Sequence, residues 1–127
     1  MHKIKVLLKF SFFLITILFF LSLFASNEKQ LGCGYWYDIE NKCIFGPSID
    51  IPPSIEKFEY NNDYIIVEQK PQEKEDIIYE RIYNYPLGRD TTYYWIIFKK
   101  RNTYYGPIIY DDMQEILKNE RINITIK

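Results

Sequence analysis

The sequence lacks histidine beyond residue 2, since its one histidine is His2. Without imidazole, the rest of the chain has no Ser–His or Cys–His nucleophilic pair, no histidine metal ligand and no imidazole acid–base catalyst. Glycine is also scarce, with five scattered residues, and no glycine-rich turn leads into a helix to cradle a phosphate. We therefore expect no metal site and no cofactor.

An excess of positive charge is missing as well. Beyond residue 25, 13 Lys and Arg residues face 17 Asp and Glu residues, which gives a net charge of about −4. Proteins that bind nucleic acid in general do so by neutralising phosphates with surplus Lys and Arg. The charge balance therefore argues against a nucleic-acid partner, and the length of about 100 residues predicts one domain with a modest core.

The first 25 residues have the character of an export signal. A basic start containing Lys3, Lys5 and Lys9 precedes an apolar run of 16 residues, Phe10 to Ala25. A membrane-spanning helix needs about 20 apolar residues, so a cleaved signal peptide is favoured, and a permanent membrane anchor stays open. Either form predicts an exported protein of the cell envelope, periplasmic or attached to the membrane.

The two cysteines allow two exclusive readings. The stretch "QLGC", Gln30 to Cys33, resembles the lipobox of bacterial lipoproteins, in which the cysteine is lipidated and becomes the first mature residue. Alternatively, cleavage after Ala25 or Ser26 would leave Cys33 and Cys43 to form a disulfide in an oxidising compartment. We expect residues 26–33 to be a tether and residues 34–127 to be a single domain.

Short aromatic and β-branched runs dominate the domain and predict an α+β fold. The runs "YWYDI", "DYIIVEQ", "DIIYERIYNY" and "TTYYWIIFKK" are typical of antiparallel strands separated by turns. Together they predict an antiparallel sheet of five to six strands. Pro52 and Pro53 predict an extended crossing segment between strands. A C-terminal helix is expected from the N-cap Asp111, with Met113, Ile116 and Leu117 on the face that packs on the sheet.

One phrase occurs twice, as "GYWYDIENKCIFGP" from Gly34 to Pro47 and as "YYWIIFKKRNTYYGP" from Tyr93 to Pro107. Each copy predicts an aromatic hairpin that ends in a Gly-Pro turn. Alternation places Tyr94, Ile96 and Phe98 on one face of the second copy's first strand and Tyr93, Trp95 and Ile97 on the other. Because neither face is polar, this strand is expected to be central and covered on both sides.

The candidate binding residues are aromatic. An exposed platform for a sugar or a partner protein would use Tyr and Trp, the usual anchors of interfaces; a thin aromatic core is the alternative. The residues proposed for binding are Tyr35, Trp36, Tyr94, Trp95, Tyr104 and Tyr105. Among the acids, Asp111 and Asp112 form a pair, which suits a helix cap better than a catalytic role. No catalytic residue is predicted.

The chain resembles a family of small exported bacterial proteins, often lipoproteins, known only as a domain of unknown function. The matching elements are "IPPSIEKFEYNNDYIIVEQKP", Ile51 to Pro71, and "TTYYWIIFKKRNTYYGPIIYDDMQEIL", Thr91 to Leu117. The resemblance implies an exported location and brings no catalytic residue. We therefore expect a non-enzymatic binding module of the envelope. The alternatives are an immunity-type inhibitor of a toxin and a small hydrolase that uses paired carboxylates.

Overall fold

The structure, a computed structural model, describes residues 9, 11–18, 27–72 and 83–126. Residues 11–18 are helical, and within the described ranges no helix is long and apolar enough to cross a membrane. From residue 27 onward the described elements, in chain order, are β1 (Glu28–Gly32), β2 (Tyr35–Asp38), β3 (Cys43–Phe45), β4 (Ile55–Tyr60), β5 (Tyr64–Gln69), β6 (Tyr93–Phe98), β7 (Thr103–Ile108) and α2 (Tyr110–Asn119).

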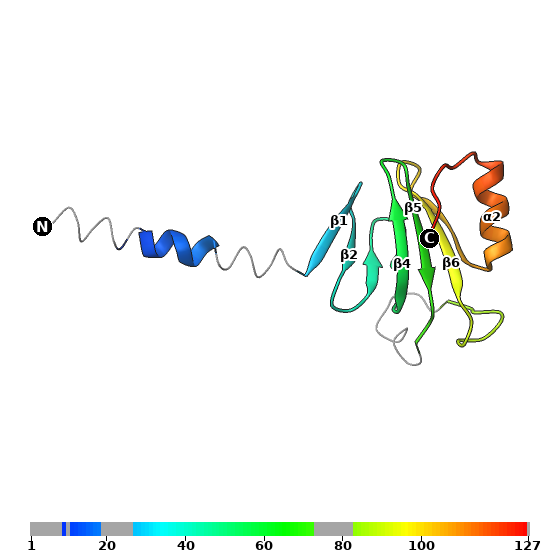
Figure 1. The fold of residues 1–127 in the computed structure, drawn as a ribbon, viewed down its shortest axis with the longest axis horizontal. Helices are drawn as coiled ribbons and strands as arrows, with labels where there is room; N and C mark the ends of the chain where they lie inside the picture. The colour runs from blue at the N-terminus through cyan, green and yellow to red at the C-terminus, as the bar shows by residue number, and fades with distance from the viewer. Residues whose placement is uncertain (1–8, 10, 19–26, 73–82, 127) are drawn as a thin grey trace, which may run out of the picture.

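These strands form two antiparallel sheets, where the sequence predicts one. The first sheet has the order β1-β2-β3 and the second has the order β4-β5-β6-β7. Figure 1 shows the first sheet, the second sheet and α2 as successive layers. The prediction of a single sheet is wrong because the segment after β3, with Pro47, Pro52 and Pro53, leaves the first sheet with only an isolated bridge between Ile44 and Ile51. The α+β class and the C-terminal helix are confirmed.

Strand β6 is central and covered on both sides, as its sequence predicts. Its two faces belong to different cores. One face packs against the first sheet in an inter-sheet core of Leu31, Tyr35, Ile44, Ile49, Ile51, Ile55, Ile65, Val67, Trp95 and Ile97. The other packs against α2 in a helix-side core of Ile66, Ile96, Phe98, Met113, Leu117 and Ile122. The period-2 alternation of β5 and β6 thus divides the apolar residues between two layers.

The doubled phrase forms two hairpins, β2–β3 and β6–β7, and its glycines have a packing role. A Cβ on Gly46 would lie 1.9 Å from Cδ1 of Tyr35, and a Cβ on Gly106 would lie 2.4 Å from Cε3 of Trp95. Each hairpin therefore lays an aromatic ring on a glycine of its return segment. Gly106-Pro107 lies inside β7 rather than in a turn, so the Gly-Pro turn predicted for the second copy is wrong.

Three further predictions need correction. Residues 26–33, assigned to a tether, contain β1, and the crossing segment after Pro53 contains β4. Helix α2 begins at Tyr110 with Ile109 as its N-cap residue, so Asp111 lies in the first turn and is not the cap. The predicted strand "DIIYERIYNY" falls largely on residues 73–82, outside the described ranges.

Candidate functional site

An open pocket of about 490 Å³ lies at one end of the two sheets, where the turns of three hairpins meet. The β1–β2 hairpin contributes residues 30–33, the β4–β5 turn contributes residues 60–62, and the β6–β7 turn contributes Lys99 and Lys100. We call this hollow the lysine pocket. Its lining residues are Gln30, Leu31, Gly32, Cys33, Tyr60, Asn61, Asn62, Lys99 and Lys100.

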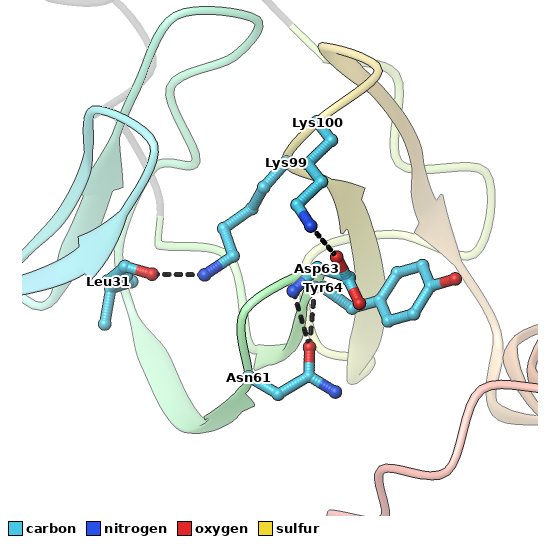
Figure 2. Close-up of polar contacts among 6 residues, drawn as sticks. All are labelled: Leu31, Asn61, Asp63, Tyr64, Lys99 and Lys100. Carbon is cyan, nitrogen blue, oxygen red and sulfur yellow. Dashed lines mark hydrogen bonds and ion pairs between the residues drawn. The ribbon is translucent and has the colours of Figure 1, made fainter.

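Lys99 connects the two sheets at this pocket. Its side chain extends from the end of β6 and its ammonium Nζ donates a hydrogen bond to the backbone oxygen of Leu31 in β1 at 2.5 Å (Figure 2). The residue is only 4 % exposed. Because a charged group is costly to remove from water, burial lowers the pKa of Lys99, while Cys33 and Asp63 raise it to a smaller extent.

The turn beneath the pocket is held by side chains. The amide oxygen of Asn61 accepts hydrogen bonds from the backbone N–H groups of Asp63 and Tyr64 at 2.9 and 2.8 Å. Lys100 forms an ion pair with Asp63 at 2.7 Å (Figure 2), and this hydrogen-bonded carboxylate raises the pKa of Lys100. Asp63 therefore pairs directly with Lys100, whereas Lys99 has no carboxylate within ion-pair distance among the described residues.

Tyr60 brings a third lysine to the pocket. The Nζ atoms of Lys29 and Lys99 lie 5.5 and 5.6 Å from the centroid of the Tyr60 ring. Both distances are within the range of a cation–π interaction. The partly exposed ring, 38 % accessible, therefore carries two positive charges near its surface.

The predicted aromatic platform is not present as one surface. Tyr35 and Trp95 are fully buried in the inter-sheet core, so they have no surface to offer a ligand. The indole Nε1 of Trp95 instead donates to Oε1 of the buried Gln69 at 2.6 Å. The sequence alternative, a thin aromatic core, describes both residues.

The other four aromatic candidates lie on different faces of the sheets. Tyr104 packs toward the inter-sheet core beside Trp95, and Tyr105, 46 % exposed, contacts Phe98 on the helix side. Trp36 stacks on Phe45 at the surface of the first sheet. Tyr94 donates to Glu68 at 2.9 Å, and its burial, together with this hydrogen bond, raises its pKa to about 12.

The two cysteines lie at opposite ends of β2. Cys33 is exposed at the tip of the β1–β2 hairpin, whereas Cys43 is buried and pairs with Asp38. From Tyr35 to Asp38 the strand rises about 10 Å, which exceeds the roughly 7 Å that a disulfide allows between Cα atoms. No disulfide joins the two residues, and the hairpin geometry does not favour one.

The predicted carboxylate pair lies away from the pocket. Asp111 and Asp112 are exposed in the first turn of α2, where negative charge suits the helix dipole. In the part of the chain that the structure describes, no group of three or more His, Cys, Asp or Glu residues is placed to hold a metal ion.

The sequence does not predict the lysine pocket, because its lining residues come from three turns that are distant in the chain. One signal was nonetheless available. Alternation along β6 places Tyr93, Trp95 and Ile97 on the face of the strand that is turned toward the first sheet. The next residue on that face is Lys99. A lysine at the next position of this buried alternation is expected to have a buried side chain.

The comparisons with known proteins give a family but no activity. No curated protein and no solved structure matches the chain. The profile of one family, described as a protein of unknown function (DUF3997), matches residues 27–127. This match begins before β1 and includes every strand that the structure describes, α2 and all the residues that line the lysine pocket. The chain therefore belongs to the DUF3997 family of proteins of unknown function.

Proposed function

We propose that the protein is a non-enzymatic binding module of the cell envelope and that it binds its partner at the lysine pocket. The observation that carries this proposal is the pocket itself, where hydrogen-bond donors and one aromatic ring converge from three turns. Asp63, the carboxylate beside it, forms an ion pair with Lys100. The pocket therefore offers groups that can hold a ligand.

The export part of the proposal rests on the leader and on β1. The basic and apolar start of the chain directs it out of the cytoplasm, with the membrane as its first partner. Cleavage at Ala25 or Ser26 would preserve β1, whereas lipidation of Cys33 as the first residue would remove it. Leu31 of β1 is 1 % exposed in the inter-sheet core. We therefore favour cleavage before β1 and a periplasmic or membrane-associated mature protein.

A specific observation also favours the immunity-type alternative. Beyond the leader the net charge is about −4, which would complement a basic toxin. The hydrolase alternative has no such support, because Asp111 and Asp112 lie outward on α2.

The test is site-specific photo-crosslinking in the producing cells. A benzophenone amino acid is placed at Tyr60, in the pocket, or at Tyr110, a matched exposed tyrosine on α2. We expect one discrete adduct from position 60 and none from position 110. A toxin in that adduct, with toxin-sensitive cells after gene deletion, would establish the immunity role. Equal labelling from both positions, or none from position 60, would refute the proposal.

A further inference from the structure

The ammonium of Lys99 is a buried charge with incomplete pairing. An ammonium has three N–H donors, and Lys99 uses one of them on the Leu31 oxygen. Among the described residues, no carboxylate lies within ion-pair distance of it. A buried charge is strongly unfavourable unless a counter-charge or full hydrogen bonding compensates it. Two donors thus have no hydrogen-bond acceptor among the described residues, and the positive charge faces the Tyr60 ring.

The surrounding residues leave space for this ammonium. A Cβ on Gly32 would lie 3.0 Å from Nζ of Lys99, and Gly32 has a φ of +91°, a conformation that favours glycine. The Tyr60 ring lies on another side of the same nitrogen. A lysine that only covered apolar surface would extend its tip into water; here the tip is turned inward against a backbone oxygen.

Further donors and positive charge lie next to Lys99. The amide oxygen of Asn61 is occupied by two backbone N–H groups, which leaves its NH₂ group to donate. The Nζ of Lys29 lies against the Tyr60 ring. Lys100 is neutralised by Asp63, so Lys29 and Lys99 supply the net charge of the pocket.

We propose that the lysine pocket binds an oxyanion, the carboxylate or phosphate group of a small molecule, with Lys99 as its principal partner. Lys29 supplies long-range attraction and the Asn61 amide donates to a second oxygen. A carboxylate and a phosphate both present anionic oxygens that accept several hydrogen bonds. This inference deepens the proposed function, since it names the chemistry of the ligand at the same pocket.

The experiment is an NMR titration of the processed, ¹⁵N-labelled protein with sodium phosphate and, separately, with sodium citrate. Ionic strength is held constant with sodium chloride. Saturable shifts of the Gly32, Cys33 and Asn62 amides with either anion support the proposal, and the anion that saturates first identifies the preferred group. Linear shifts that sodium chloride alone reproduces would overturn it.

Two substitutions separate the pocket from general electrostatics. A hydrogen bond to a charged group contributes about 1.5–3 kcal/mol, so Lys99→Gln should weaken binding about tenfold or more. Lys118→Gln, at an exposed lysine of α2, should leave affinity unchanged. If Lys99→Gln does not fold, Lys29→Gln, at an exposed position, should still weaken binding measurably. If the folded variant, Lys99→Gln or Lys29→Gln, binds the anion as tightly as wild type does, the assignment of the lysine pocket as an oxyanion site is refuted.

The outcome also separates this inference from the proposed function. A crosslink from position 60 without saturable anion binding would support the binding module and refute the oxyanion as its ligand. If neither the crosslink nor saturable anion binding is observed, the lysine pocket is not a binding site.

Discussion

Two glycines of this chain lie against aromatic rings, and the doubled phrase is best understood from them. Gly46 faces the ring of Tyr35 and Gly106 faces the indole of Trp95. Each position lacks room for a methyl group, because the ring occupies that space. The ring is the Tyr of "YW" in the first copy and the Trp in the second, so the two hairpins share a contact between an aromatic ring and a glycine but do not make it with the same residue of the phrase. Both aromatics lie in the inter-sheet core.

Alanine substitutions at three glycines separate steric overlap from backbone strain. Gly88→Ala meets no atom within 4 Å but has a φ of +85°, so only strain, about 1–2 kcal/mol, is expected. Gly46→Ala meets the Tyr35 ring and should cost about 1–3 kcal/mol through overpacking. Gly106→Ala, with φ +148°, combines both effects and should be the most destabilising. Urea denaturation gives the three values, and a Gly106→Ala cost below that of Gly88→Ala would contradict this account.

Lys99 should give the unfolding free energy a characteristic pH dependence. Burial lowers its pKa from the ordinary value of 10.5. Between the lowered pKa and 10.5 the unfolded chain binds more protons at this residue than the folded chain does, so stability rises with pH across that window. Wild type should thus gain stability relative to Lys99→Gln as pH increases from 7 toward 10.5. Urea midpoints at several pH values test this.

The exposed Lys118→Gln variant is the control for that pH series, because it removes a lysine from the surface of α2 and leaves Lys99 in place. A constant difference between wild type and Lys99→Gln would show that the ammonium is not held in a desolvated position.

At the scale of the element, prediction succeeded where apolar residues are dense. Strand β6 has six consecutive aromatic or β-branched residues, and helix α2 has a clear apolar face, so the sequence predicts both. Strands β1 and β4 were not, because "EKQLG" has one apolar residue and a register shift interrupts the alternation of "IEKFEY". These segments are strands because they pair with a neighbouring strand, and the local sequence does not reveal that pairing.

Strand β1 should be required for stability. It places Leu31 in the inter-sheet core and supplies the backbone oxygen that Lys99 uses. Leu31→Ala should cost about 2–5 kcal/mol, the usual range for a buried leucine. A chain beginning at Cys33 should lose more than this variant does, whereas a chain beginning at Asn27 should unfold cooperatively. Equal urea midpoints for the two shortened chains would show that β1 is dispensable.

At the scale of the whole molecule, the lysine pocket exists only because two sheets pack together. Its lining residues come from positions 30–33, 60–62 and 99–100, and the sequence predicted neither the second sheet nor the strand that brings Leu31 to Lys99. Local patterns report periodicity within one element. They do not report which turns meet at one end of the sheets, so the sequence does not predict the candidate site. The buried position of Lys99 alone follows from the alternation along β6.

The same architecture leads to a prediction about processing in cells. Since β1 lies before Cys33 and completes the inter-sheet core, we expect a mature chain that begins at Ser26 or Asn27, with an unmodified thiol at Cys33. The intact mass of the protein extracted from cell envelopes measures both features. Cys33→Ser should then be cleaved and localised like wild type, because the thiol takes no part in processing. A chain that begins at Cys33 with a diacylglyceryl adduct, together with an uncleaved Cys33→Ser protein, would show instead that this domain folds without β1 and that the lipobox is used.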